Sequence, residues 1–285
     1  MRALCRIDET RRLPRKGNQG LLDLHCHILP GVDDGAECME ESCEMAQLAG
    51  ESGVRGLEAT ARCNIPGGYR NYWSDDMRTM LPEVEYQLQQ KNIPLKLYMG
   101  MEVFATNDVP ELLAAGKILT INNSRYLLIE FDFEESYVRA QRILQNTCAA
   151  GAIPIIAHPE RYAFVQSDLA YVRELKDMGC ILQINKGSLY GAFGRRSKDA
   201  AHLLMENRLA DIVSSDAHGP YRRTPYMRDA HEVVCRDYSP DYAQLLFRDN
   251  PYRVLTNQRT LNPAIEIDAA AFHQRTHTHL EESWE

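Results

Sequence analysis

The chain has 285 residues, of which 44% are hydrophobic and 25% charged, and this fits a large globular domain with a sizeable core. Its formal net charge of −8 argues against a nucleic-acid partner, because phosphate contacts need concentrated Lys and Arg. No apolar run approaches the roughly 18 residues of a membrane span. The charged N-terminus also lacks the apolar core of a secretory signal. We therefore expect a cytoplasmic protein without membrane insertion.

Seven apolar runs with a preference for strand structure recur along the chain. They cover residues 21–27, 56–60, 95–103, 126–131, 153–158, 180–185 and 211–216. Helical patterns lie between them, for example at 39–53, 168–179 and 197–208. Alternating strands and helices predict an α/β fold with a parallel sheet, and seven such units without a linker predict a distorted TIM-like (βα) barrel.

The two ends of the chain differ from this pattern. We predict an N-terminal extension over 1–20, the barrel domain over 21–268 and a C-terminal tail over 269–285. His273, His277 and His279 lie in the tail, and we interpret them as solvated rather than metal-binding. The eight cysteines show no paired spacing and are expected to be reduced.

Polar side chains follow most of the predicted strands, at the rim where barrel active sites collect. In chain order they are His25 and His27 with Asp33 and Asp34, Arg62 and Cys63, Glu102, Glu130, His158, and Asp216 with His218. Glu130 alone fits a salt-bridged rim carboxylate equally well, and His158 alone fits a core or capping histidine better. Their combination at one rim predicts a bound cation.

The spacing of the first two histidines supports a metal site. His25 and His27 are two residues apart on a strand and share a face. Imidazoles combined with carboxylates suit Zn, Mn or Fe better than Ca. The set is too large for one ion, so it predicts two or three divalent metals sharing carboxylates. Such a cluster would bind an anionic substrate and generate hydroxide near neutral pH.

Six stretches carry a family resemblance between about residues 21 and 258. They are DLHCHILPGVDDGA, GMEVFA, YLLIEFDF, AHPERY, QINKGSLYGAFGR and SSDAHGPYRRTPYM. They resemble the bacterial protein-tyrosine phosphatases of the polymerase-and-histidinol-phosphatase (PHP) type, which are associated with capsule and exopolysaccharide gene clusters. The resemblance implies a metal-dependent phosphatase acting on the phosphotyrosine-rich tail of a membrane-associated bacterial tyrosine kinase. It also implies manganese as the metal, with Fe, Zn, Co or Mg as alternatives.

The resemblance also implies a role for each site residue. The first metal would be held by His25, His27, Glu102 and Asp216, the second by Glu102, Glu130 and His158, and the third by Asp34 and His218. Arg161 and Arg223 match arginines expected near the substrate phosphate, whose oxygens suit a planar guanidinium.

One position departs from the family pattern. The family reads Ala-Thr-Pro-His after its second strand, with the histidine on the third metal, whereas this chain has Arg62 there. Arginine has no acceptor and cannot ligate a metal. We therefore expect two well-occupied metals, with Arg62 paired to Asp34 or reaching the substrate phosphate. Cys63 could offer a thiolate, but as the neighbouring strand residue it should point elsewhere.

Three other functions are alternatives to a metal-dependent tyrosine phosphatase. A histidinol-phosphate phosphatase shares the fold type, and a phosphotyrosine-binding pseudoenzyme would follow if Arg62 had ended turnover. A cysteine phosphatase needs a Cys-x5-Arg loop, and only Cys5 has an arginine at that distance, Arg11. That stretch has no glycine to let backbone amides wrap a phosphate, so we regard the match as chance.

Overall fold

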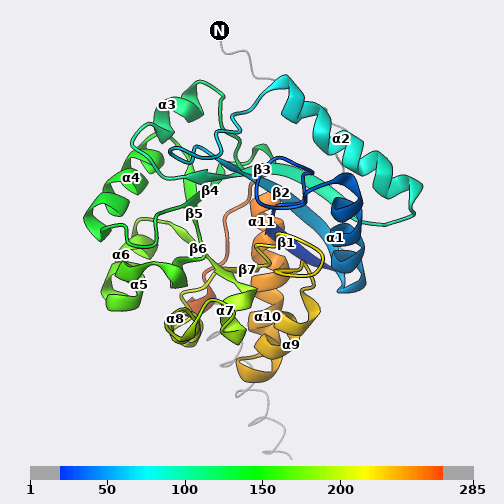
Figure 1. Cartoon of the computed structure of the whole chain (residues 1–285). Coiled ribbons are helices and arrows are strands. Elements are labelled where there is room, and N and C mark those ends of the chain that lie inside the picture. The colour runs from blue at the N-terminus through cyan, green and yellow to red at the C-terminus, as the bar shows by residue number, and fades with distance from the viewer. Residues whose placement is uncertain (1–19, 266–285) are drawn as a thin grey trace, which may run out of the picture.

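The computed structural model describes residues 20–265, and in it seven parallel strands pair in chain order. The strands are β1 (Leu21–Cys26), β2 (Val54–Cys63), β3 (Lys96–Phe104), β4 (Tyr126–Glu130), β5 (Ile153–Ala157), β6 (Ile181–Asn185) and β7 (Ile212–Ser214). Figure 1 shows them in the middle of the molecule with most helices around them. The predicted α/β barrel of seven units is confirmed, and β2 is longer at both ends than its apolar run indicated.

The helices connect successive strands and complete the C-terminal part of the barrel. The longer ones are α1 (Met39–Glu51), α2 (Asp75–Gln90), α4 (Tyr137–Ala149), α6 (Leu169–Asp177), α8 (Arg195–Glu206) and α9 (Arg228–Asp237). The short ones are α3 (Val109–Ala114), α5 (Ala163–Ser167), α7 (Lys186–Tyr190), α10 (Pro240–Gln244) and α11 (Asn250–Leu255), with single turns η1 (Ile121–Asn123), η2 (Pro159–Arg161) and η3 (Leu245–Asp249). Helices α1, α6 and α8 confirm the three predicted patterns. Serine side chains cap α2 and α4, where Ser74 and Ser136 accept from backbone N–H groups of the first turn.

The barrel closes between its first and last strands through the chain that follows β7. A single parallel bridge joins Cys26 to Ala217. The N–H of Asp216 donates to the carbonyl oxygen of His25 at 2.9 Å, and the N–H of His27 donates to that of Ala217 at 2.9 Å. Because of this closure, residues almost 200 positions apart in sequence lie next to each other at the carboxyl ends of the strands.

The core has two layers separated by the sheet. An inner cluster fills the barrel and includes Leu22, Leu24 and Tyr98, and an outer cluster lies between the strands and the surrounding helices. Val254 and Leu255 of α11 belong to the inner cluster. Helix α11 is joined to η1, which precedes β4, since the side chain of Asn122 donates to the Leu255 carbonyl oxygen. The amino end of the barrel is thereby covered, and the carboxyl end is left for a site.

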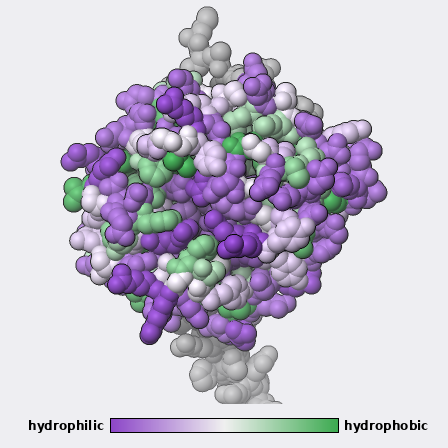
Figure 2. Space-filling model, in the orientation of Figure 1, coloured by the Kyte–Doolittle hydropathy of each residue, from purple (hydrophilic) through white to green (hydrophobic). Residues whose placement is uncertain are grey.

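The surface view shows a mostly hydrophilic face with small, separate hydrophobic patches (Figure 2). No helix within residues 20–265 is both long and apolar enough to cross a membrane. The predicted domain limits at 20 and 268 remain predictions. Cys5, Arg11 and the three tail histidines lie outside the described residues.

Candidate metal centre

The eight predicted metal ligands lie together at the carboxyl end of the barrel. Three groups of side chains have ligand atoms within 4.8 Å of one another. They are His25, His27 and Asp216; Glu102, Glu130 and His158; and His27, Asp34 and His218. Ligands from separate strands converge there because parallel strands end at one rim.

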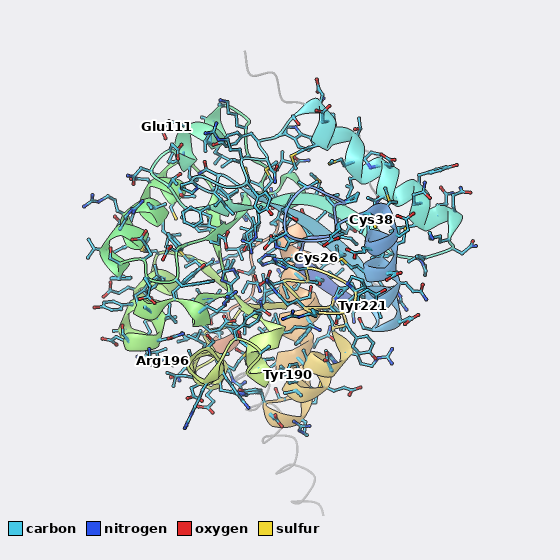
Figure 3. All side chains as sticks on the ribbon, in the orientation of Figure 1. Cys26, Cys38, Glu111, Tyr190, Arg196 and Tyr221 are labelled. Atoms are coloured by element: carbon cyan, nitrogen blue, oxygen red, sulfur yellow. The ribbon has the colours of Figure 1, made fainter. Side chains whose placement is uncertain are left out.

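An irregularity in β1 turns both histidines toward this rim. The pairing register between β1 and β2 shifts between Asp23 and Cys26. Leu22 and Leu24 belong to the inner cluster before the shift, whereas Cys26 belongs to the outer cluster after it. His25 and His27 therefore share the inner face, as their spacing predicts. Figure 3 shows Cys26 close to the middle of the molecule.

Hydrogen bonds fix the tautomers of the two histidines. His25 Nδ1 lies 2.8 Å from Gln183 Oε1, and the Gln183 amide nitrogen donates to the carbonyl oxygen of Ile184, so the amide oxygen faces the ring. His27 Nδ1 lies 2.8 Å from Asp33 Oδ2. An amide or carboxylate oxygen accepts, so each Nδ1 carries the proton and each Nε2 of a neutral ring keeps a lone pair. This arrangement is typical of metal-binding histidines.

The first group brings three potential metal-ligand atoms close together. The two Nε2 atoms of His25 and His27 are 3.3 Å apart. Oδ1 of Asp216 lies 3.4 Å from the first and 3.5 Å from the second, and it is buried without a hydrogen-bond partner. With both rings neutral, the three electron pairs repel each other unless a cation lies among them. Burial alone would lower the pKa of both histidines, but the nearby carboxylates raise it because they favour positive charge at this point. These atoms therefore fit a divalent metal.

Asp216 is held by its other oxygen. Its Oδ2 accepts from the Asn185 side-chain amide at 2.6 Å and from Arg223 Nη2 at 2.5 Å. Asn185 ends β6 and Arg223 lies in the loop after β7, and Asp216 itself has a left-handed backbone with φ of 49°. Such backbones cluster at functional sites, where packing holds the strained residue.

The second group is centred on Glu102. Nε2 of His158 lies 3.1 Å from Glu102 Oε1 and 3.7 Å from Glu130 Oε2. Glu102 Oε1 is also 3.2 Å from His25 Nε2, so this carboxylate lies between the first group and the second. Burial, and then the charge of Glu102, raise the pKa of Glu130, which Arg62 partly offsets. The concentration of buried negative charge fits a second cation.

The third group is altered by Arg62, which contacts the ligands of two groups. Its Nε donates to Asp34 Oδ1 at 2.7 Å, and its Nη1 lies 2.6 Å from Glu130 Oε1 and 3.1 Å from Glu102 Oε2. Arg62 reaches Glu102 because the two residues are paired in register on the neighbouring strands β2 and β3. The pairing with Asp34 matches one of the two expected alternatives.

Arg62 also uses the lone pair of His218. Nδ1 of His218 lies 3.0 Å from the carbonyl oxygen of Asp216 and therefore carries the proton. The remaining Nε2 lies 3.3 Å from Arg62 Nη2, which donates to it. Burial alone would lower the pKa of Arg62, but Glu102, Glu130 and Asp34 raise it above its usual range. A permanent cation thus contacts the ligand atoms of two members of the third group, Asp34 and His218.

Arg161 and Arg223 lie beside the metal-ligand groups. Arg161 ends η2, which follows His158, and Arg223 lies in the loop after β7. That loop is attached to α1 by Tyr221, whose hydroxyl donates to Glu44 Oε2 at 2.8 Å (Figure 3). Both predicted arginines therefore belong to the same rim as the ligands.

Cys63 points away from this centre, as expected. Its side chain is buried, and its thiol donates to the carbonyl oxygen of Arg70 at 3.1 Å. Burial raises the pKa of the thiol to about 12. A protonated, outward-facing thiol is a poor metal ligand.

Several residues that support the ligands were not predicted as metal ligands or phosphate-binding residues from the sequence. Asp33 and Gln183 orient the histidines, and Asn185 holds Asp216. Gln183 is a polar residue inside an otherwise apolar strand, and this signal could have indicated a buried partner. Phe133 and Phe193, which lie against Arg161, gave no comparable signal.

The fold and the three ligand groups define a barrel protein with a candidate metal centre at the carboxyl ends of its strands. The chain belongs to the family described as capsular polysaccharide synthesis, CpsB/CapC, which matches residues 21–256. It is 33% identical over 238 residues to the tyrosine-protein phosphatase YwqE of Bacillus subtilis, which covers 84% of this chain and 92% of YwqE. It is also 33% identical over 243 residues to the tyrosine-protein phosphatase CpsB of Streptococcus pneumoniae, covering 84% and 99% of the two chains.

Solved structures agree with this placement. A crystal structure from work on YwqE of Bacillus subtilis and CpsB of Streptococcus pneumoniae, described as unique metal-dependent tyrosine phosphatases, has a TM-score of 0.77. It is 32% identical and covers 85% of this chain and 96% of that one. A phosphotriesterase from Mycobacterium tuberculosis, at 12% identity and a TM-score of 0.55, shares the fold alone.

Proposed function

We propose that the protein hydrolyses phosphotyrosine on a protein substrate with the help of divalent transition metals. The observation that carries this proposal is the convergence of His25 Nε2, His27 Nε2 and Asp216 Oδ1, which lie 3.3 to 3.5 Å from one another. The family and the named activity of its relatives support the choice of a phosphotyrosine substrate.

The metal would be held by two of the three groups. His25, His27, Glu102 and Asp216 would hold one ion, and Glu102, Glu130 and His158 a second. Manganese is our first choice, with Fe, Zn, Co or Mg as alternatives, because mixed imidazole and carboxylate ligands suit transition metals. Such ions supply hydroxide at neutral pH and withdraw charge from a phosphoryl group.

Arg62 would take the place of a third ion. Each carboxylate of the second group directs one oxygen to His158 and the other to Arg62. Metal and guanidinium can therefore share these carboxylates without competing for one atom. Asp34 and His218, whose ligand atoms face Arg62, would have too few free electron pairs to hold an ion.

Arg161 and Arg223 would bind the phosphate of the substrate. A guanidinium forms paired hydrogen bonds with phosphate oxygens, and these charge-assisted bonds are stronger than neutral ones. Arg223 is already held by Asp216, so it would link the phosphate to the first metal group. We further propose a cytoplasmic location and, as the physiological partner, the tail of a membrane-associated bacterial tyrosine kinase that controls capsular or exopolysaccharide synthesis.

Phosphate release from a phosphotyrosine peptide tests this function. We expect release by the metal-loaded protein, loss in excess chelator, and recovery when manganese is added back. Cysteine alkylation should not reduce the rate, since the metals supply the nucleophile. Activity that survives chelation but is lost on alkylation would contradict the proposal.

Two alternatives are separated by the same assay. A pseudoenzyme would bind the phosphotyrosine peptide without releasing phosphate. A small-molecule phosphatase would release phosphate from histidinol phosphate much faster than from the peptide. The first result would overturn hydrolysis, and the second would overturn the proposed substrate class.

A further inference from the structure

Arg161 is held by aromatic rings rather than by acids. Its guanidinium carbon lies 4.1 Å from the centre of the Phe133 ring and 4.4 Å from the centre of the Phe193 ring. Within residues 20–265, its guanidinium has no hydrogen bond or ion pair to a protein group. A cation held against aromatic faces keeps its in-plane N–H donors free. Arg161 is therefore ready to bind an anion.

A second arginine shares one of these rings. The guanidinium carbon of Arg223 lies 5.4 Å from the centre of the Phe193 ring, and its buried Nε has no hydrogen-bond partner. Two like charges on one ring repel each other, and the repulsion is relieved when an anion lies between them. The unpaired donor on Arg223 supports an anion site at this point.

The position of Phe193 depends on a glycine. A Cβ atom added at Gly187 would lie 2.8 Å from Cε2 of Phe193, closer than real contacts allow. Gly187 is the second residue of α7, which is capped by Asn185, whose side-chain oxygen accepts from the Gly187 N–H at 2.9 Å. The same Asn185 side chain donates to Asp216, so one residue both caps the helix against which Phe193 packs and holds a candidate metal ligand.

Phe133 offers an apolar surface beside the metal-ligand groups. Phe133 comes three residues after the end of β4, and its side chain is 40% exposed. Its ring centre lies 6.1 Å from that of His158, at an interplanar angle of 65°. An aromatic ring entering the site with its phosphate at Arg161 would meet this surface.

We propose that Phe133, Phe193 and Arg161 form a receptor for aryl phosphates. Arg161 binds the phosphate, Phe193 positions Arg161, and the open part of Phe133 packs against the ring that carries the phosphate. Phe133 thereby favours phosphotyrosine over phosphates on alkyl groups. This inference rests on the proposed function and names the residues that select its substrate.

Binding of two phosphonates to the metal-loaded protein tests the receptor without turnover. Phenylphosphonate carries the ring and methylphosphonate does not, and calorimetry gives a Kd for each. We expect the native protein to prefer phenylphosphonate. Phe133→Leu should reduce the preference by roughly three- to tenfold, the size of an aromatic pair. Tyr86→Leu, at an exposed tyrosine on α2, is the matched control and should keep the preference.

Phe193→Leu tests the positioning role. It should weaken both phosphonates and raise KM more than it lowers kcat, whereas Phe193→Tyr, which keeps the ring, should restore both values. Metal content should remain that of the native protein in both variants. A Phe193→Leu variant that binds both phosphonates as tightly as the native protein would overturn this role.

The receptor and the proposed function can fail separately. Equal binding of the two phosphonates by a native protein that hydrolyses the peptide overturns the receptor alone. A clear preference for phenylphosphonate in a native protein that releases no phosphate supports the receptor and refutes hydrolysis. Loss of preference in Tyr86→Leu as well as Phe133→Leu would overturn the assignment of Phe133.

Discussion

Two arginines at the same rim are held in opposite ways. Arg62 contacts three carboxylates, from Asp34, Glu102 and Glu130. Arg161 contacts two phenyl rings, from Phe133 and Phe193. The donors of Arg62 are used within the protein, and those of Arg161 are free for an incoming group. The partners of a side chain therefore indicate its role better than its type does.

The difference has a physical basis in charge balance. Arg62 lies where buried carboxylates accumulate, and a fixed cation reduces their mutual repulsion without binding a substrate. Burial lowers the pKa of Arg161; nearby Asp216 raises it, and Arg223 lowers it further. Arg161, whose charge is only partly compensated by nearby acids, therefore attracts an anion more strongly than Arg62, whose charge three carboxylates compensate. We therefore assign charge compensation to Arg62 and phosphate binding to Arg161.

Removal of the two histidines of the first group should abolish metal binding and activity, and should have the largest effect of the changes considered. The double change His25→Ala and His27→Ala removes both Nε2 ligands, so we expect loss of bound metal and of all phosphate release. Elemental analysis and the phosphotyrosine peptide assay measure the two effects. His231→Ala, on the remote helix α9, is the matched control and should change neither. Unchanged metal content and turnover in the double variant would refute the assignment of the centre.

Arg62→Gln should affect stability most strongly without metal. The change leaves Glu102 and Glu130 buried without their fixed cation, and the loss of one partner of a buried ion pair costs about 3–5 kcal/mol. Added metal should restore part of this loss, because it compensates the same carboxylates. Denaturant unfolding of metal-free and metal-loaded protein measures the difference. Equal stability of Arg62→Gln and native protein without metal would contradict the role of Arg62.

Arg161→Ala should reduce activity and leave metal binding unchanged. Charge-assisted hydrogen bonds contribute about 1.5–3 kcal/mol, so we expect kcat/KM for the phosphotyrosine peptide to fall by roughly 10- to 100-fold. The metal content should stay the same, since Arg161 contacts none of the ligands through its guanidinium. Steady-state kinetics together with elemental analysis test this. A loss of metal equal to the loss of activity would argue against phosphate binding by Arg161.

The arrangement of elements could be predicted from the sequence to a large extent. Apolar runs predicted the seven strands, and the polar residues at and just after their carboxyl ends predicted the eight candidate ligands that the structure brings together. Strand ends in a parallel barrel meet at one rim, so position along the chain is enough to bring these residues together.

The residues that orient the candidate ligands and arginines could not be predicted in the same way. The partners of His25 depend on Gln183 in a distant strand, and the register shift in β1 decides which face the histidines take. Phe133 and Phe193 lie in loops whose paths follow no periodic pattern. Arg62 was identified as unusual, but its contact with Glu130 requires the pairing of β2 with β3 and of β3 with β4.

Cys63→Ala should have the smallest effect. The residue is next to Arg62 on β2 but belongs to the outer cluster, so removal of its buried sulfur should cost about 1 kcal/mol of stability. Metal content and phosphate release should not change. Thermal unfolding and elemental analysis measure both, and a loss of one ion per chain would show that Cys63 is a ligand after all.

The number of metal ions per chain tests the central claim about Arg62 most directly. We predict two ions in the native protein, since Arg62 donates to the atoms of Asp34 and His218 that would otherwise ligate a metal. Arg62→His removes the fixed charge and supplies an imidazole, so this variant should bind a third ion and release phosphate faster. Elemental analysis of both proteins, purified and loaded with manganese in the same way, gives the counts. Three fully occupied ions in the native protein, or the same count in both proteins, would contradict the claim.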